Sequence, residues 1–110
     1  MKFEQLYNIM KDYFEKQDFS GFGEGVYSYE FDVTGEGEGK FYVEVRDGNF
    51  DIQPFDYKNS VCSFTVSSGE LKRLIERSVS PADSYSTGRL TVKGDVSAAF
   101  RLADALMLSM

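Results

Sequence analysis

Apolar residues recur at steps of three and four in the first and last parts of the chain. From Phe3 to Phe14 they fall on one side of a helix, and polar residues occupy much of the rest. A second stripe predicts a final helix that begins after Asp95 and carries Val96, Phe100, Ala103, Met107 and Met110 on one face. The pattern therefore predicts an amphipathic helix near each end of the chain.

Between these helices the pattern changes to a period of two, which is typical of strands with one buried face. Strands are predicted over residues 26–33, 40–46, 49–53, 61–66 and 89–93. Asp47 and Gly48 predict a two-residue hairpin turn, because both central positions of that turn need a positive φ. Gly88 and Gly94 bound the last strand, and Asp95 is placed to cap the helix that follows.

A helix, followed by a short helix or turn, is predicted between the fourth and fifth strands. Ser67 and Glu70 have the spacing in which each side chain bonds the other's backbone amide at a helix start. This helix is predicted to bury Leu71, Leu74 and Ile75. Ser80 and Pro81 open the short helix or turn, because proline is favoured at the first helical position, and Tyr85 in this segment is expected to point inward.

The order of helix, four strands, two helices, strand and helix is typical of the α+β class. We predict a five-stranded, mostly antiparallel sheet with the helices packed on one face, in which the first four strands follow one another antiparallel. The chain has 110 residues, of which 42% are hydrophobic, including 10 Phe and 7 Tyr. A chain of this size buries one core, so residues 1–110 are expected to form a single domain.

Charge and missing residue types narrow the range of functions. The net charge of −6 disfavours binding to nucleic acid or to anionic lipid head groups. The chain has no histidine, which removes the commonest general base and the usual nitrogen ligand of metals. Its single cysteine, Cys62, excludes an internal disulfide and is expected to be a small buried core residue in a reducing compartment. No apolar stretch approaches the length of about twenty residues that spans a bilayer.

Neither glycines nor carboxylates form a convincing catalytic motif. Glycines 35, 37 and 39 lie between two predicted strands, whereas a phosphate-binding loop needs a helix after it. Glu30 and Asp32 fall on the solvent-exposed face of the first predicted strand, where acidic residues mostly serve to keep the protein soluble. We therefore expect a cytoplasmic protein that is not an enzyme and has neither a cofactor nor a metal.

The run GRLTVKGDVSAAFRLADAL, from Gly88 to Leu106, resembles the closing strand and helix of the sterol carrier protein 2 (SCP2-like) family. The resemblance extends back to Ser60 through a strand, a serine-opened helix and a proline-initiated turn, and so covers nearly half of the chain. It implies an apolar tunnel between sheet and helices that binds fatty acyl chains, acyl-CoA esters, phospholipids or sterols without catalysis. The lipid-binding residues expected on this basis, besides the sheet face, are Leu71, Leu74, Ile75, Tyr85, Phe100, Ala103, Met107 and Met110.

The acidic charge departs from the basic character of animal members of this family, which argues against acyl-CoA binding and membrane docking. We therefore expect an apolar lipid as the partner, no nucleic acid, no stable membrane insertion, and a monomer or weak homodimer. A second interpretation is a protein-interaction or dimerisation module without a ligand, because SCP2-like domains also occur as accessory parts of larger enzymes.

Overall fold

The computed structural model describes residues 2–56, 59–106 and 108. Its elements are, in chain order, α1 (Phe3–Glu15), the short 3-10 helix η1 (Ser20–Phe22), β1 (Val26–Thr34), β2 (Gly39–Arg46), β3 (Asn49–Gln53), β4 (Cys62–Ser67), α2 (Ser68–Ile75), α3 (Pro81–Ser86), β5 (Leu90–Gly94) and α4 (Val96–Ala105). The observed strands lie within one residue of the predicted bounds. None of the helices in the described part of the chain has the length and hydropathy needed to cross a bilayer.

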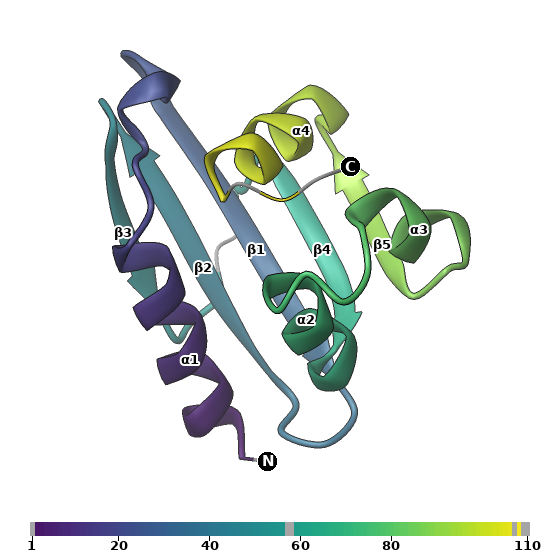
Figure 1. The fold of residues 1–110 in the computed structure, drawn as a ribbon. Coiled ribbons are helices and arrows are strands. Elements are labelled where there is room, and N and C mark those ends of the chain that lie inside the picture. Colours follow the sequence, from purple (N-terminus) through teal and green to yellow (C-terminus); the bar gives the residue numbers. More distant parts are fainter. Residues whose placement is uncertain (1, 57–58, 107, 109–110) are drawn as a thin grey trace.

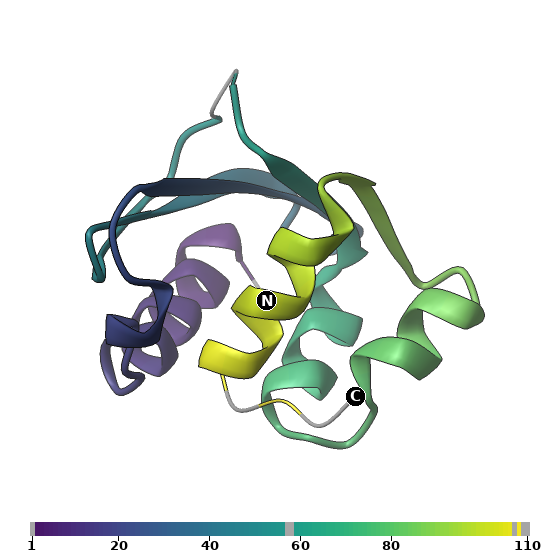
Figure 2. The ribbon, with the colours of Figure 1, turned by 90° about the horizontal axis from the view of Figure 1, so that it is seen from above.

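The five strands form one sheet in the order β3-β2-β1-β4-β5, with the helices in front of it in Figure 1. Seen from above, all four α-helices lie on the same side of the sheet (Figure 2), as predicted. Helix α1 covers the part of the sheet that contains β2 and β3, while α2 and α4 cover β1 and β4, and α3 lies beside β5. The molecule is therefore a two-layer α+β structure, with its core between the layers.

Strands β1 and β4 pair in parallel, whereas the other three pairs are antiparallel. The expectation that the first four strands follow one another antiparallel is therefore wrong for the fourth. Strand β4 does not pair with β3. It pairs instead with the free edge of β1, so that β1, which has nine residues, has a partner strand on both sides. The described residues that follow β3 and precede β4, 54–56 and 59–61, lie on the face away from the helices (Figure 2).

Short polar side chains fix the starts of three helices, as predicted. Ser67 and Ser80 accept hydrogen bonds from the backbone amides of the residues three positions on, and Asp95 does the same for α4. The predicted second bond, in which the amide of Ser67 would donate to the Glu70 carboxylate, is not formed, because that carboxylate accepts from Ser84 and Arg73 instead. Before Asp95 the chain turns sharply at Gly94, with φ +101°, where a Cβ atom would collide with the carbonyl of Val61.

Aromatic rings fill the core under β1, β2 and β3. The ring of Phe14 lies 6.0 Å from that of Phe19 and 6.4 Å from that of Phe31, centre to centre. Phe31 stacks in turn on Phe41, its partner across β1 and β2, at 4.6 Å. Cys62 is also buried, as expected, on β4 at the edge of this region and beside Tyr29 of β1. This part of the interior is closely packed.

Candidate functional site

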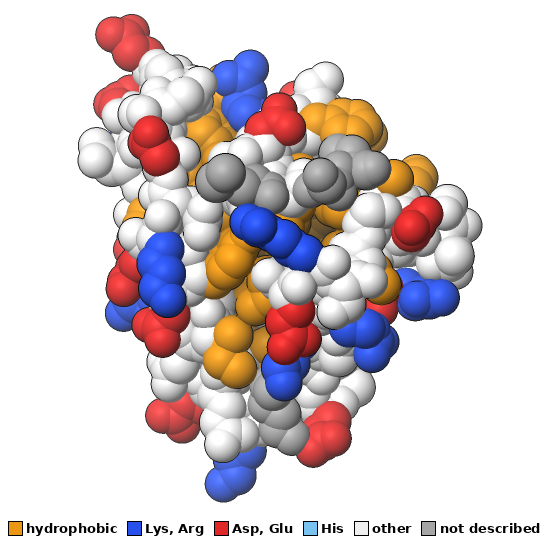
Figure 3. Space-filling model, viewed as in Figure 1, with side chains coloured by type: hydrophobic (Ala, Val, Ile, Leu, Met, Phe, Trp, Pro, Cys, Tyr) orange, Lys and Arg blue, Asp and Glu red, His pale blue; other side chains and the backbone are white. Residues whose placement is uncertain are grey.

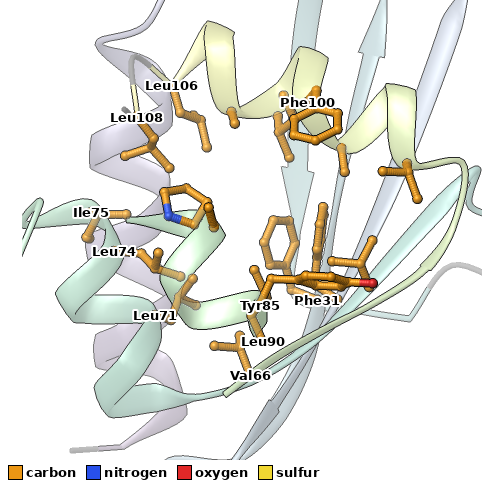
Figure 4. A pocket seen from close by; sticks show the side chains of 18 of the residues that line it. Phe31, Val66, Leu71, Leu74, Ile75, Tyr85, Leu90, Phe100, Leu106 and Leu108 are labelled. Carbon is orange, nitrogen blue, oxygen red and sulfur yellow. The ribbon is translucent and has the colours of Figure 1, made fainter. Parts of the chain in front are cut away.

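An apolar cavity of about 260 Å³ lies between the β4 and β5 side of the sheet and helices α2, α3 and α4 (Figure 4). It is lined by Met10, Phe31, Phe64, Val66, Leu71, Leu74, Ile75, Pro81, Ala82, Tyr85, Leu90, Val92, Val96, Ala99, Phe100, Leu102, Ala103, Leu106 and Leu108. Among the described residues, every lining side chain is apolar except for the hydroxyl group of Tyr85. The cavity is therefore suited to hydrocarbon.

The sheet supplies the floor of the cavity. Because side chains alternate along a strand, every second residue of β1, β4 and β5 faces the helices. The register places Phe64 of β4 between Phe31 of β1 and Val92 of β5, and Val66 beside Leu90. The rings of Phe31 and Phe64 are 4.9 Å apart, so the floor is a continuous apolar surface across three strands.

Three helices supply the walls. Leu71, Leu74 and Ile75 project from α2 toward the cavity, and Phe100 projects from α4 on the opposite side (Figure 4). Helix α4 also contributes two alanines, Ala99 and Ala103, which lie one turn apart. Because alanine ends at Cβ, these positions leave space that larger side chains would fill.

The cavity opens at a mouth formed by three half-exposed side chains. Tyr85 of α3 is 58% exposed, and Val96 and Phe100 of α4 are 53% and 50% exposed. Figure 3 shows hydrophobic side chains in a hollow between α4 and α2 and at the surface near α3. Tyr85, which was expected to point inward, therefore lies at the mouth instead.

Six of the eight residues predicted to bind lipid line this cavity, and Met107 and Met110 lie outside the described residues. The six are Leu71, Leu74, Ile75, Tyr85, Phe100 and Ala103. The prediction named only a sheet face, without residues, and missed Leu102, Leu106 and Met10. Leu102 and Leu106 lie four residues apart, so helical periodicity could have identified them. Met10 could not be identified in this way, because it reaches the cavity from the opposite end of the chain.

A buried carboxylate lies behind the cavity wall. Glu70 of α2 is 1% exposed, and its oxygens accept hydrogen bonds from Ser84 Oγ at 2.7 Å and from Arg73 Nε at 2.9 Å. Arg89 Nη1 lies 3.7 Å from the same carboxylate. The hydrogen bond from Ser84 lowers the pKa of Glu70, the two arginines act in the same direction, and burial opposes them. The carboxylate is therefore ionised at neutral pH.

The fold has counterparts among known proteins. The model of the SCP-2 sterol transfer family matches residues 14–107, which is most of the chain. The chain belongs to this family. Membership in the SCP-2 family implies lipid binding or transfer. No group of three or more potential metal-ligating side chains occurs in the part of the chain that the structure describes.

Solved structures show the same fold at low sequence identity. A solution structure of palmitated SCP2L2 from Aedes aegypti is 17% identical, with a TM-score of 0.71 over 96% of this chain and 95% of that chain. Sterol carrier protein 2 from Yarrowia lipolytica, in an apo form, is 17% identical, with a TM-score of 0.59 over 93% of this chain and 73% of that chain.

The SCP-2 fold also occurs within a larger protein. A double mutant of the sec-alkyl sulfatase PisA1 is 10% identical, with a TM-score of 0.78 over 93% of this chain but only 16% of that chain. A search of curated proteins gives no match. At these identities the likenesses establish the fold alone.

Proposed function

We propose that this protein binds a single hydrocarbon chain of a lipid in the cavity between β4, β5 and helices α2, α3 and α4, and carries it without catalysing a reaction. The observation that supports this proposal most directly is a lining of apolar side chains that ends at a half-exposed apolar mouth. A lipid tail would enter through that mouth and leave its polar head in water. The family match and the palmitated structural relative support the same class of ligand.

The size of the cavity limits how much of a ligand it holds. An engineered cavity of about 150 Å³ in another protein accepts benzene, which corresponds to roughly 25 Å³ for each carbon. On that scale the 260 Å³ cavity holds about ten carbons. We therefore propose one acyl chain of a fatty acid or phospholipid. A sterol has more than twice as many carbons and would require the walls to move apart.

Burial alone gives such a ligand useful affinity. Each buried methylene contributes about 0.8 kcal/mol, so roughly ten carbons offer about 8 kcal/mol before the costs of binding. Leaving the cavity empty is unfavourable, because a void of 260 Å³ costs up to about 6 kcal/mol at roughly 24 cal/mol per Å³. The protein is therefore expected to retain lipid during purification.

The test is a series of saturated fatty acids of increasing length, titrated into delipidated protein by displacement of a fluorescent fatty acid. Affinity is expected to rise about fourfold for each added methylene and to level off near ten carbons. Cholesterol is expected not to compete. The absence of saturable uptake at every length would contradict the proposal.

A matched pair of variants on α4 locates the binding site. Ala103 lines the cavity, whereas Ala105, two residues further on, does not. Replacing Ala103 with Phe is expected to fill the cavity and lower affinity at least tenfold. Replacing the partly buried Ala105 with Phe adds the same ring elsewhere on the helix and is expected to leave affinity within about twofold. Equal effects of the two substitutions would place the ligand elsewhere.

An interaction module without a ligand is the second candidate. The observation in its favour is that the same fold occupies only 16% of the PisA1 chain, as one part of a larger protein. The half-exposed Tyr85, Val96 and Phe100 would then form an apolar contact surface. Sedimentation at several concentrations separates the candidates, because a tight dimer that takes up no fatty acid supports the module.

A further inference from the structure

Helix α3 forms one wall of the cavity but has almost no apolar anchor of its own. Of its residues 81–86, only Ser84 is buried, at 1% exposure. Pro81, Ala82 and Tyr85 of the same helix line the cavity. The side of α3 that would ordinarily pack on other side chains therefore faces the cavity instead.

The side chain that secures α3 is the carboxylate of Glu70. Ser84 Oγ donates a hydrogen bond to Glu70 Oε2 at 2.7 Å, and both groups are buried. Arg73 on α2 and Arg89 before β5 hold the charge in place from the surface, where their side chains are about half exposed. Among the hydrogen bonds of the described residues, the one from Ser84 is the only link between this carboxylate and α3.

The network lies directly behind the cavity wall. Glu70 precedes Leu71, Ser84 precedes Tyr85, and Arg89 precedes Leu90. Leu71, Tyr85 and Leu90 all line the cavity. Through side-chain contacts, one buried carboxylate therefore links three wall segments at the residues next to those that line the cavity.

A simple helix cap does not account for this arrangement. The Ser67 hydroxyl accepts from the amide of Glu70, but the Glu70 side chain turns away from Ser67 and toward α3. Burying a carboxylate is costly unless hydrogen bonds and opposite charges compensate for the lost water. Arg73 compensates from α2 itself, whereas the hydrogen bond from Ser84 and the ion pair with Arg89 link α2 to α3 and to the start of β5.

We propose that Glu70 is a positioning residue that latches α3 over the cavity as a lid, through its hydrogen bond with Ser84. The lid opens when that bond breaks, because no other buried side chain of α3 retains it, and ligand then enters or leaves past Tyr85. The latch therefore sets the rate of ligand exchange, while the apolar lining sets the affinity. This inference rests on the proposed lipid-binding function.

The test compares two serine-to-alanine substitutions on the same helix. Ser84→Ala removes the latch, whereas Ser86→Ala removes an exposed hydroxyl that bonds only the backbone of Asp83. The rate at which a bound fluorescent fatty acid leaves for excess lipid vesicles of neutral phosphatidylcholine is measured by stopped flow. Ser84→Ala is expected to accelerate release about tenfold or more, with a smaller change in equilibrium affinity, and Ser86→Ala to leave the rate within about twofold.

A conservative variant and a second measurement separate the latch from general stability. Glu70→Gln keeps an acceptor for the Ser84 hydroxyl but loses the charge, and is expected to release ligand at a rate between those of wild type and Ser84→Ala. Hydrogen exchange is expected to show the amides of α3 exchanging at least tenfold faster in Ser84→Ala, with α1 unchanged.

The outcomes distinguish the inference from the function it builds on. Wild-type protein that takes up no fatty acid refutes the proposed function, and the exchange of the α3 amides still decides whether Ser84 holds that helix. Wild-type binding with the same release rate in the Ser84→Ala and Ser86→Ala variants overturns the latch. So does a Ser84→Ala variant whose amides exchange faster throughout the protein, because that result assigns Ser84 an ordinary structural role.

Discussion

Helices α1 and α4 lie on the same face of the sheet, but they pack against it differently. The inner residues of α1, Leu6, Met10 and Phe14, are at most 1% exposed. On α4, Phe100 and Val96 are half exposed, and the inner side of the helix borders the cavity. The difference follows from side-chain size, because α1 presents Leu, Met and Phe to the sheet where α4 presents several alanines.

This contrast separates the two tasks of a small lipid-binding protein. The half under β1, β2 and β3 is packed with aromatic rings, and the burial of these rings stabilises the fold. The half under β4 and β5 is packed less completely and contains the cavity. We expect substitutions in the first half to change stability most, and substitutions in the second half to change binding more than stability.

The largest expected effect comes from deleting matched aromatic rings on either side of Phe31. Phe41 and Phe64 are its partners on β2 and β4, but Phe41 is fully buried whereas Phe64 lines the cavity. Phe41→Ala is expected to cost about 3–5 kcal/mol in free energy of unfolding. Phe64→Ala is expected to cost about 1–2 kcal/mol less, because part of its ring contacts empty space. Denaturant titration measures both, and equal losses would show that the two halves are packed alike.

Sequence alone predicted the local structure well, because local structure depends on neighbouring residues. The period-two pattern gave the strands to within a residue, and Ser67, Ser80 and Asp95 marked the starts of α2, α3 and α4. The pairing of β4 with β1 was missed, because alternation tells which side chains are buried but not which strand lies alongside.

The pattern of hydrophobic and polar positions could not predict the cavity or the Glu70 network, for a related reason. Ala99 and Ala103 are visible in the sequence, but a void arises only if no side chain from the facing elements fills the space they leave. Glu70 had the spacing of a helix cap, yet its partner Ser84 lies 14 residues away and meets it only in the folded chain. Both features depend on tertiary packing.

The next effect contrasts two neighbouring alanines of α4. Ala98 is 3% exposed, lies in the core and accepts a hydrogen bond from Tyr29 through its carbonyl, whereas Ala99 faces the cavity. Ala98→Leu is expected to destabilise the protein by about 1–3 kcal/mol through overpacking. Ala99→Leu is expected to leave the free energy of unfolding nearly unchanged and to weaken fatty-acid binding. A similar loss of stability in both variants would mean that the cavity cannot accept added side-chain volume.

The smallest expected effect tests whether water is excluded from the boundary between the two halves, which is the seam between β1 and β4. Tyr29 of β1 and Cys62 of β4 are partners across this seam, and both are almost fully buried. Burial raises the pKa of the Cys62 thiol to about 11, with the charge of Asp95 acting in the same direction, and burial also raises the pKa of Tyr29. Since an unfolded thiol titrates near 8.5 to 9, the folded state holds its proton more tightly than the unfolded state does.

The sign of the pH dependence follows from that difference. The contribution of Cys62 to stability is complete below about pH 8.5 and is lost as the pH rises toward 11. At about pH 10 the free energy of unfolding is expected to be about 1.5 kcal/mol lower than at neutral pH, and Cys62→Ala is expected to remove most of that decline. A wild-type stability that stays flat to pH 10 would mean that water reaches the thiol from the cavity. The aromatic half would then not be sealed from the half that contains the cavity.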